Sequence, residues 1–212
     1  MTELTGPTRP PAAGGAPQSL VVFLHGYGAD GADLMGLADA LAPALPQTAF
    51  ASPHAPLGMA MGGRAWFELT MRDPTEYARG VLAAAPVLQA YLDHELGRLS
   101  LPGTALGIVG FSQGTMMALH VAYRRAAAPA CVVGFSGLCA DADEEALKPS
   151  PTLLIHGVAD EVVPAAQTLA AAQVLANKGV PVEWHMVPGL GHGIDPTGLT
   201  MAADHLRRHL AR

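Results

Sequence analysis

Short apolar segments alternate along this chain with stretches that are apolar at helical spacing, and this alternation restricts the possible folds more than any other feature. The apolar segments cover residues 19–24, 48–52, 105–109, 131–136, 152–155 and 182–187. Apolar runs rich in β-branched residues are typical of parallel strands that are buried on both faces. The alternation therefore predicts an α/β fold, with a mostly parallel central sheet, helices on both faces, right-handed crossovers and no large cap domain.

The intervals between these segments carry the start and stop signals of helices. One helical pattern ends at Pro43, a capping box at 73–76 opens the next, and Pro164 and residues 195–196 open the last two. The side chains expected to face the core are Leu34, Leu37 and Leu41, then Tyr77, Val81, Leu88, Leu92 and Leu96, then Leu169 and Leu175, and finally Leu199, Leu206 and Leu210.

The length of 212 residues fits one domain with a continuous core. Residues 1–18 form the predicted flexible lead-in, because seven of the twelve residues at 6–17 are Gly or Pro, and a short edge strand is expected near Leu4. Residues 19–212 form the predicted α/β domain. We expect it to be a monomer or a homodimer.

The charge balance and the cysteine count limit the partners of such a domain. A net charge of -6, with 12 Lys and Arg in no basic stripe, argues against a nucleic-acid partner. Cys131 and Cys139 are too few for a disulfide framework and lack metal-ligand spacing, so free thiols in a reducing compartment are expected. The N-terminus has no signal-peptide pattern, and no apolar stretch approaches the ~18 residues of a membrane span. These features favour a soluble, cytoplasmic protein without integral membrane association.

Residues 110–114 match the pattern G-x-S-x-G, with an apolar strand before them and a helical pattern at 115–123 after them. In this context the pattern is typical of a nucleophile elbow, a sharp turn that holds a serine hydroxyl outward above the sheet. Gly110 and Gly114 are expected because side chains there would collide with neighbouring backbone. The sequence thus predicts Ser112 as a nucleophile.

An activated serine needs a base and an acid, and in an open α/β sheet these collect at the carboxyl ends of strands. His192 lies in the glycine-rich loop 188–193 between the last strand and the last helix, and is the predicted base. The predicted acid is Asp160, just past a strand end, with Glu161 as the alternative. Structural roles are expected for the histidines in predicted helices, His120, His205 and His209, and for His185 in a predicted strand. His25 and His156 each precede a glycine at the end of a strand. The order Ser112, Asp160, His192 is that of α/β-hydrolases.

Acyl transfer through a serine also needs donors for the oxyanion that develops on the substrate. The backbone N–H of Gln113 is one candidate, and the N–H of Tyr27, in the loop after the first strand, is the second. No cofactor and no metal are expected for this chemistry.

The sequence fits two other classes of function less well. Residues 26–31 also satisfy G-x-G-x-x-G, which would suit a dinucleotide-binding module or an oxidoreductase. That reading needs an acidic residue roughly 20 positions further on, yet residues 40–67 contain no Asp or Glu. A metallohydrolase is disfavoured because H-E-x-x-H or a comparable ligand spacing is missing.

The segments 24–31, 110–114, 156–164 and 191–192 together resemble the carboxylesterase/phospholipase family that includes acyl-protein thioesterases. The resemblance runs from about Leu20 to the C-terminus. It implies hydrolysis of a small-molecule or lipid ester, with thioesters and lysophospholipids as related substrates. It also implies that Trp66 and Phe67, which look exposed in the long irregular stretch 53–72, border an acyl groove. Two positions depart from the usual family pattern, Glu68 and Thr115.

Overall fold

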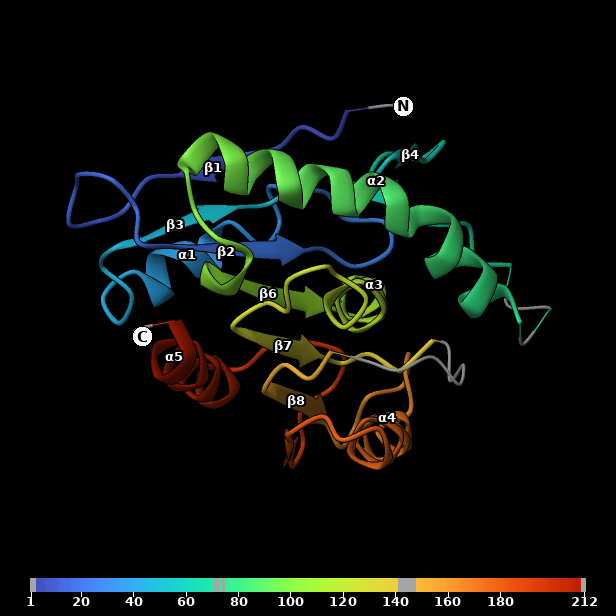
Figure 1. Ribbon diagram of the computed structural model, residues 1–212. Coiled ribbons are helices and arrows are strands. Elements are labelled where there is room, and N and C mark those ends of the chain that lie inside the picture. The colour runs from blue at the N-terminus through green and yellow to red at the C-terminus, as the bar shows by residue number, and fades with distance from the viewer. Residues whose placement is uncertain (1–2, 71–72, 74, 141–147, 211–212) are drawn as a thin grey trace.

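The computed structural model describes residues 3–70, 73, 75–140 and 148–210, and its centre is a seven-stranded sheet (Figure 1). The strand order is β1-β3-β2-β6-β7-β8-β9. Only β1 pairs antiparallel, with β3, and the remaining pairs are parallel. The strands are β1 (Thr8–Arg9), β2 (Ser19–Leu24), β3 (Thr48–Ala51), β6 (Leu106–Phe111), β7 (Cys131–Phe135), β8 (Thr152–Gly157) and β9 (Val182–Val187). The predicted fold class, a mostly parallel sheet with helices, is confirmed.

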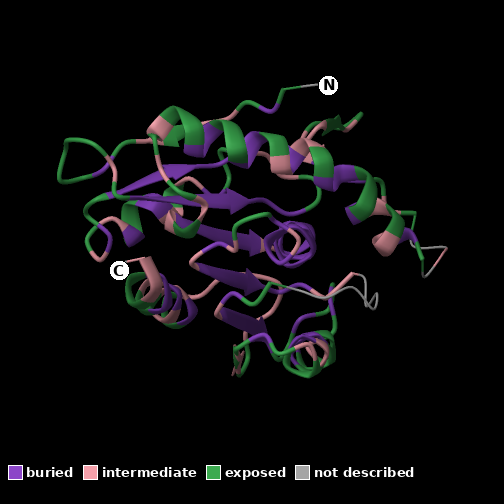
Figure 2. Cartoon of the chain, in the orientation of Figure 1, coloured by how far each residue is buried: buried purple, intermediate pink, exposed green. Residues whose placement is uncertain are grey.

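Helices cover both faces of this sheet (Figure 1). One hydrophobic cluster joins one set of alternate strand side chains to α2 (Glu76–Leu99), α3 (Gln113–Ala122) and α4 (Ala166–Asn177). A second cluster joins the opposite set, which includes Val21 and Phe23, to α1 (Gly36–Leu41) and α5 (Pro196–Leu210). Figure 2 shows the central strands buried between the two layers. Among the described residues, no helix is long and apolar enough to cross a membrane.

Smaller elements complete the chain. A 3-10 turn at Gly103–Ala105 precedes β6, and an antiparallel pair, β4 (Leu57–Gly58) and β5 (Arg64–Ala65), lies within the irregular stretch that follows β3. The edge strand expected near Leu4 is instead β1, four residues later, and Leu4 is a buried core residue. Strands of two residues leave no periodicity for sequence reasoning to detect.

Two local predictions for the helices were wrong. Leu169 is 45% exposed, because the buried face of α4 is formed by Thr168, Ala171, Ala172 and Leu175, and Leu169 lies outside it. In the predicted capping box, the side-chain bonds found for Glu76 among the described residues run to Thr70 and not to Asp73. Oε2 of Glu76 accepts hydrogen bonds from the N–H and the hydroxyl of Thr70, and Asp73 instead accepts from Thr75. Pro74 lies outside the described residues.

A buried histidine on α5 makes the stability of this fold depend on pH. His205 is 1% exposed, its Nε2 lies 3.2 Å from the Pro151 carbonyl, and its ring packs on His209. Burial is the main cause that lowers the pKa of His205 from 6.5 to about 4. His209 and Arg208 act in the same direction, against the Pro151 carbonyl and Glu183. The unfolded chain therefore binds this proton at a higher pH than the folded chain does.

Replacing His205 with glutamine should flatten the loss of stability in mild acid. Above pH 6.5 both states are neutral at this site, and from 6.5 down to about 4 only the unfolded state gains the proton, so stability falls. The glutamine side chain cannot titrate and keeps an amide donor for Pro151, so up to about 3 kcal/mol of this fall should disappear. Urea unfolding at pH 7 and pH 4.5 measures it, with the exposed His94→Gln as control. Equal pH slopes for wild type and His205→Gln would contradict the prediction.

Candidate active site

Ser112 occupies a strained turn between β6 and α3. Its backbone has φ 53 and ψ -116, a conformation that costs a non-glycine residue roughly 1–3 kcal/mol. A Cβ on Gly110 would lie 2.5 Å from the Gly114 carbonyl oxygen, and one on Gly114 would lie 1.8 Å from the Leu24 oxygen. The turn can therefore form only with glycine on both sides of it, and it leaves Ser112 at the carboxyl end of the sheet.

The elbow is tied to β7 by two hydrogen bonds to one carbonyl. The Ser112 N–H donates to the Phe135 oxygen at 2.9 Å, and the Thr115 hydroxyl donates to the same oxygen at 2.8 Å. Thr115 fits there because Gly134 faces it: a Cβ on Gly134 would come within 2.6 Å of the Thr115 methyl. The departure from the family pattern at Thr115 thus adds a bond that a glycine cannot make.

Asp160 lies in the loop after β8, and both oxygens of its carboxylate accept hydrogen bonds. Oδ1 accepts the N–H groups of Val162 and Val163, both at 2.9 Å, and Oδ2 lies 2.8 Å from Nδ1 of His192. Burial alone would raise the pKa of Asp160. The hydrogen bonds from His192, Val163 and Val162 outweigh burial and hold the pKa below its ordinary value. The group is therefore a carboxylate at neutral pH, whereas the alternative acid, Glu161, is exposed.

The bond to Asp160 fixes the tautomer of His192. A carboxylate only accepts, so Nδ1 of His192 carries the proton and Nε2 of the neutral ring keeps its lone pair. The ring packs on Phe111, the neighbour of Ser112, with centroids 4.9 Å apart. The Asp160 side chain is wholly buried and that of His192 is 19% exposed, so the pair has one end inside and one end toward solvent.

A second histidine touches the same carboxylate, a contact that sequence reasoning missed. His156 is completely buried, and its Nε2 lies 2.8 Å from the Val163 carbonyl oxygen and 3.1 Å from Oδ2 of Asp160. Both neighbours are acceptors, so Nε2 carries the proton, and Nδ1 is left for the Thr168 hydroxyl at 2.7 Å. The spacing of four residues between His156 and Asp160 was the available sequence signal.

The loop after β2, residues 25–29, carries the predicted oxyanion donor Tyr27; it is called the oxyanion loop and lies beside the elbow. A Cβ on Gly26 would be 3.4 Å from Cβ of Ser112. His25 is buried, and burial is the main cause that lowers its pKa. Its Nε2 accepts from Ala55 N–H, so the ring is neutral with its proton on Nδ1. Among the described residues, no partner is found for the backbone N–H of Tyr27 or of Gln113.

Trp66 and Phe67 are buried, which corrects the expectation that they are exposed. Their exposed fractions are 1% and 5%, and the indole Nε1 of Trp66 donates to the His25 carbonyl at 3.0 Å. Aromatic side chains in a glycine-rich stretch look exposed in sequence. Here they fill the space between the stretch after β3 and helix α2, which no local pattern reveals.

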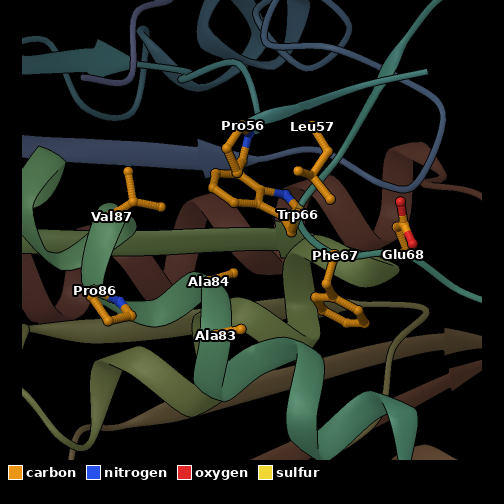
Figure 3. Close-up of a pocket in the computed structure, with 9 residues that line it drawn as sticks. All are labelled: Pro56, Leu57, Trp66, Phe67, Glu68, Ala83, Ala84, Pro86 and Val87. Carbon is orange, nitrogen blue, oxygen red and sulfur yellow. The ribbon is translucent and has the colours of Figure 1, made fainter. Parts of the chain in front are cut away.

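Both aromatic residues line a cavity of about 540 Å³, a size suited to a small apolar ligand. Figure 3 shows them opposite the residues of α2. The described lining residues do not include Ser112 or His192; they are Pro56, Leu57, Trp66, Phe67, Glu68, Ala83, Ala84, Pro86 and Val87. The bond of Trp66 to His25 joins one wall of this cavity to the oxyanion loop. Glu68, the other departure from the family pattern, is an exposed residue of this lining.

The geometry does not favour dinucleotide binding by the glycines at 26–31. The N–H of Gly28 is already bonded to the Arg64 carbonyl at 2.8 Å. The helix that follows, α1, starts only at Gly36 and has six residues. A dinucleotide loop needs free N–H groups that lead directly into a helix N-terminus.

Several proteins with similar sequences and structures are named as esterases or thioesterases. The family model for Phospholipase/Carboxylesterase matches residues 12–210. The esterase YpfH of Escherichia coli (strain K12) is 30% identical over 90% of this chain and 82% of its own length. Acyl-protein thioesterase 1 of Gibberella zeae is 26% identical over 90% of each chain. The crystal structure of esterase PE8 has a TM-score of 0.94 at 36% identity, with 99% of this chain and 100% of that chain covered.

Proposed function

Because this chain belongs to the phospholipase/carboxylesterase family of α/β-hydrolases, we propose that it hydrolyses carboxylic esters through an acyl-enzyme on Ser112. Asp160 and His192 complete the proposed catalytic triad. The observation that carries this proposal is the 2.8 Å contact between Nδ1 of His192 and the buried carboxylate of Asp160, beside a strained serine elbow. In this arrangement Nε2 of a neutral His192 ring is the nitrogen left to accept a proton, as the role of base requires.

In the proposed mechanism, Ser112 Oγ attacks the carbonyl carbon while its proton passes to Nε2 of His192. The resulting imidazolium is stabilised by the Asp160 carboxylate, whose pKa is lowered and which therefore stays ionised. The N–H groups of Tyr27 and Gln113 receive the oxyanion, and no cofactor or metal takes part. His192 then returns the proton to the leaving alcohol or thiol, and a water molecule repeats the sequence to release the acid.

The substrate class follows from the same parts. The acyl group would enter the cavity lined by Trp66 and Phe67, whose volume of about 540 Å³ and mostly apolar lining suit an apolar chain. Thioesters react by the same steps. Two relatives are named acyl-protein thioesterase 1, and these names support thioesters as substrates beside oxygen esters. Lysophospholipids remain within the proposed class, since a relative in Mus musculus is named lysophospholipase-like protein 1.

The test is a hydrolysis screen of oxygen esters and thioesters with acyl chains from two to twelve carbons, with Ser112→Ala as background. Turnover above this background for some members of the series is expected. Rates equal to those of the alanine variant for every substrate, with the protein folded, would refute the proposed function.

Filling the cavity should change the preference for acyl length. Ala83 is an exposed residue of α2 that lines the cavity, so Ala83→Phe occupies the groove without disturbing the core. Each methylene excluded from an apolar site costs about 0.8 kcal/mol, so the loss of three lowers kcat/KM for long acyl chains roughly 60-fold. Acetyl esters should be cleaved at nearly the wild-type rate.

The matched control is Ala90→Phe, an exposed position on the same helix that is outside the cavity lining. It should leave the whole chain-length series unchanged. If Ala83→Phe lowered kcat/KM by the same factor for every chain length, the cavity would not be the acyl site.

A further inference from the structure

The side chain of Gln113, the residue that follows Ser112, forms hydrogen bonds to the backbone of the cavity wall at Trp66 and Phe67. Its Oε1 accepts the N–H of Trp66 at 2.9 Å, and its Nε2 donates to the carbonyl of Phe67 at 2.8 Å. Gln113 is 1% exposed, so both bonds are shielded from water. An amide is one of the few side chains that can match a donor and an acceptor at the same time.

The segment that carries Trp66 and Phe67 is also hydrogen-bonded to the oxyanion loop. We call residues 53–68 the groove loop. Besides the bond from the Trp66 indole to His25, the Gly28 N–H donates to the Arg64 carbonyl at 2.8 Å, and the Arg64 N–H donates to Ala29 at 2.7 Å. The groove loop therefore contacts both backbone segments that supply the proposed oxyanion donors.

We propose that the Gln113 side chain is a positioning residue, which aligns an acyl chain in the cavity with Ser112 and the oxyanion donors. This inference rests on the proposed function. One residue supplies a donor through its backbone and holds the cavity wall through its side chain, so the wall keeps a fixed place relative to the reacting carbonyl. Interactions with a remote part of a substrate raise kcat only when such alignment is rigid.

The consequence is specific to acyl length. A long acyl chain lies against Trp66 and Phe67, so loss of the two Gln113 hydrogen bonds misplaces the carbonyl of the substrate. An acetyl group does not extend along the wall and depends on the elbow and the oxyanion donors alone. A residue with a merely structural role would lower stability and leave the ratio of the two kcat values unchanged.

The test replaces Gln113 with methionine, which has similar length but neither donor nor acceptor. For Gln113→Met we expect the ratio of kcat for an octanoyl ester to kcat for an acetyl ester to fall at least tenfold. Gln113→Leu also lacks both donor and acceptor, and should change the same ratio in the same direction if the methionine variant does not fold. The exposed Gln167→Met, on α4, is the matched control and should leave both values unchanged.

Two controls separate this inference from the proposed function. Wild type and variants are treated with a fluorophosphonate, which should add one group at Ser112 in each folded protein. Absence of label and turnover in wild type would refute the function itself. The positioning role alone would be overturned if wild type turned over normally and a folded Gln113 variant lost activity equally on both esters. It would also be overturned if that variant lost no activity.

Discussion

Ser112→Ala is expected to abolish ester hydrolysis, with a loss of about 10⁶-fold in kcat, since the other parts of a triad contribute little without the nucleophile. The variant should fold, because within the described part of the chain no hydrogen bond of the Ser112 hydroxyl holds the elbow. The turn is held by the backbone N–H of Ser112 and by Thr115. Hydrolysis of a short ester, with a thermal melt beside it, measures both parts of the prediction.

A matched control is available in a second serine of similar local structure. Ser136 follows β7, as Ser112 follows β6, and it also has a left-handed backbone, with φ 49. It is fully buried, and its hydroxyl has no hydrogen-bond partner among the described residues. Ser136→Ala should therefore keep its activity. Fluorophosphonate label on Ser136 in place of Ser112, or full activity of Ser112→Ala, would contradict the assignment of the nucleophile.

The parts of the fold that sequence could predict are those governed by local periodicity and turn chemistry. Two strands, 19–24 and 182–187, were predicted with their observed bounds, and the elbow glycines are required by the short distances around Gly110 and Gly114. Each of these features follows from a few consecutive residues. Parallel buried strands leave a clear pattern because both of their faces are apolar.

The parts that sequence could not predict depend on contacts between distant segments. Trp66 and Phe67 are buried because α2 packs against the stretch after β3, and the Gln113 amide reaches that stretch 46 and 47 positions away in sequence. Leu169 was placed inward because a leucine is a better core residue than the neighbouring Thr168. The hydroxyl of Thr168 is buried at little cost because it meets His156. Buried polar pairs of this kind oppose the hydrophobic pattern on which the prediction relied.

The choice of acid can be tested by Asp160→Asn, which is expected to lower kcat about 10⁴-fold. In the folded protein the oxygen of the new amide must take the place of Oδ1, because the N–H groups of Val162 and Val163 both point there. The amide NH₂ then faces Nδ1 of His192, which must accept a proton where it formerly donated one. His192 is held in the wrong tautomer, with its proton on Nε2, and cannot take the proton of Ser112.

The same substitution should destabilise the protein slightly, because the amide NH₂ also meets the Nε2 proton of His156, 3.1 Å from the original oxygen. Kinetics on a short ester, beside a thermal melt, separate this effect from the loss of the tautomer. Glu161→Gln is the matched control, one residue further on and exposed, and it should cost less than twofold in kcat. If Glu161→Gln lost activity and Asp160→Asn kept it, Glu161 would be the acid. The bonded carboxylate of Asp160 would then be a structural feature of the loop after β8.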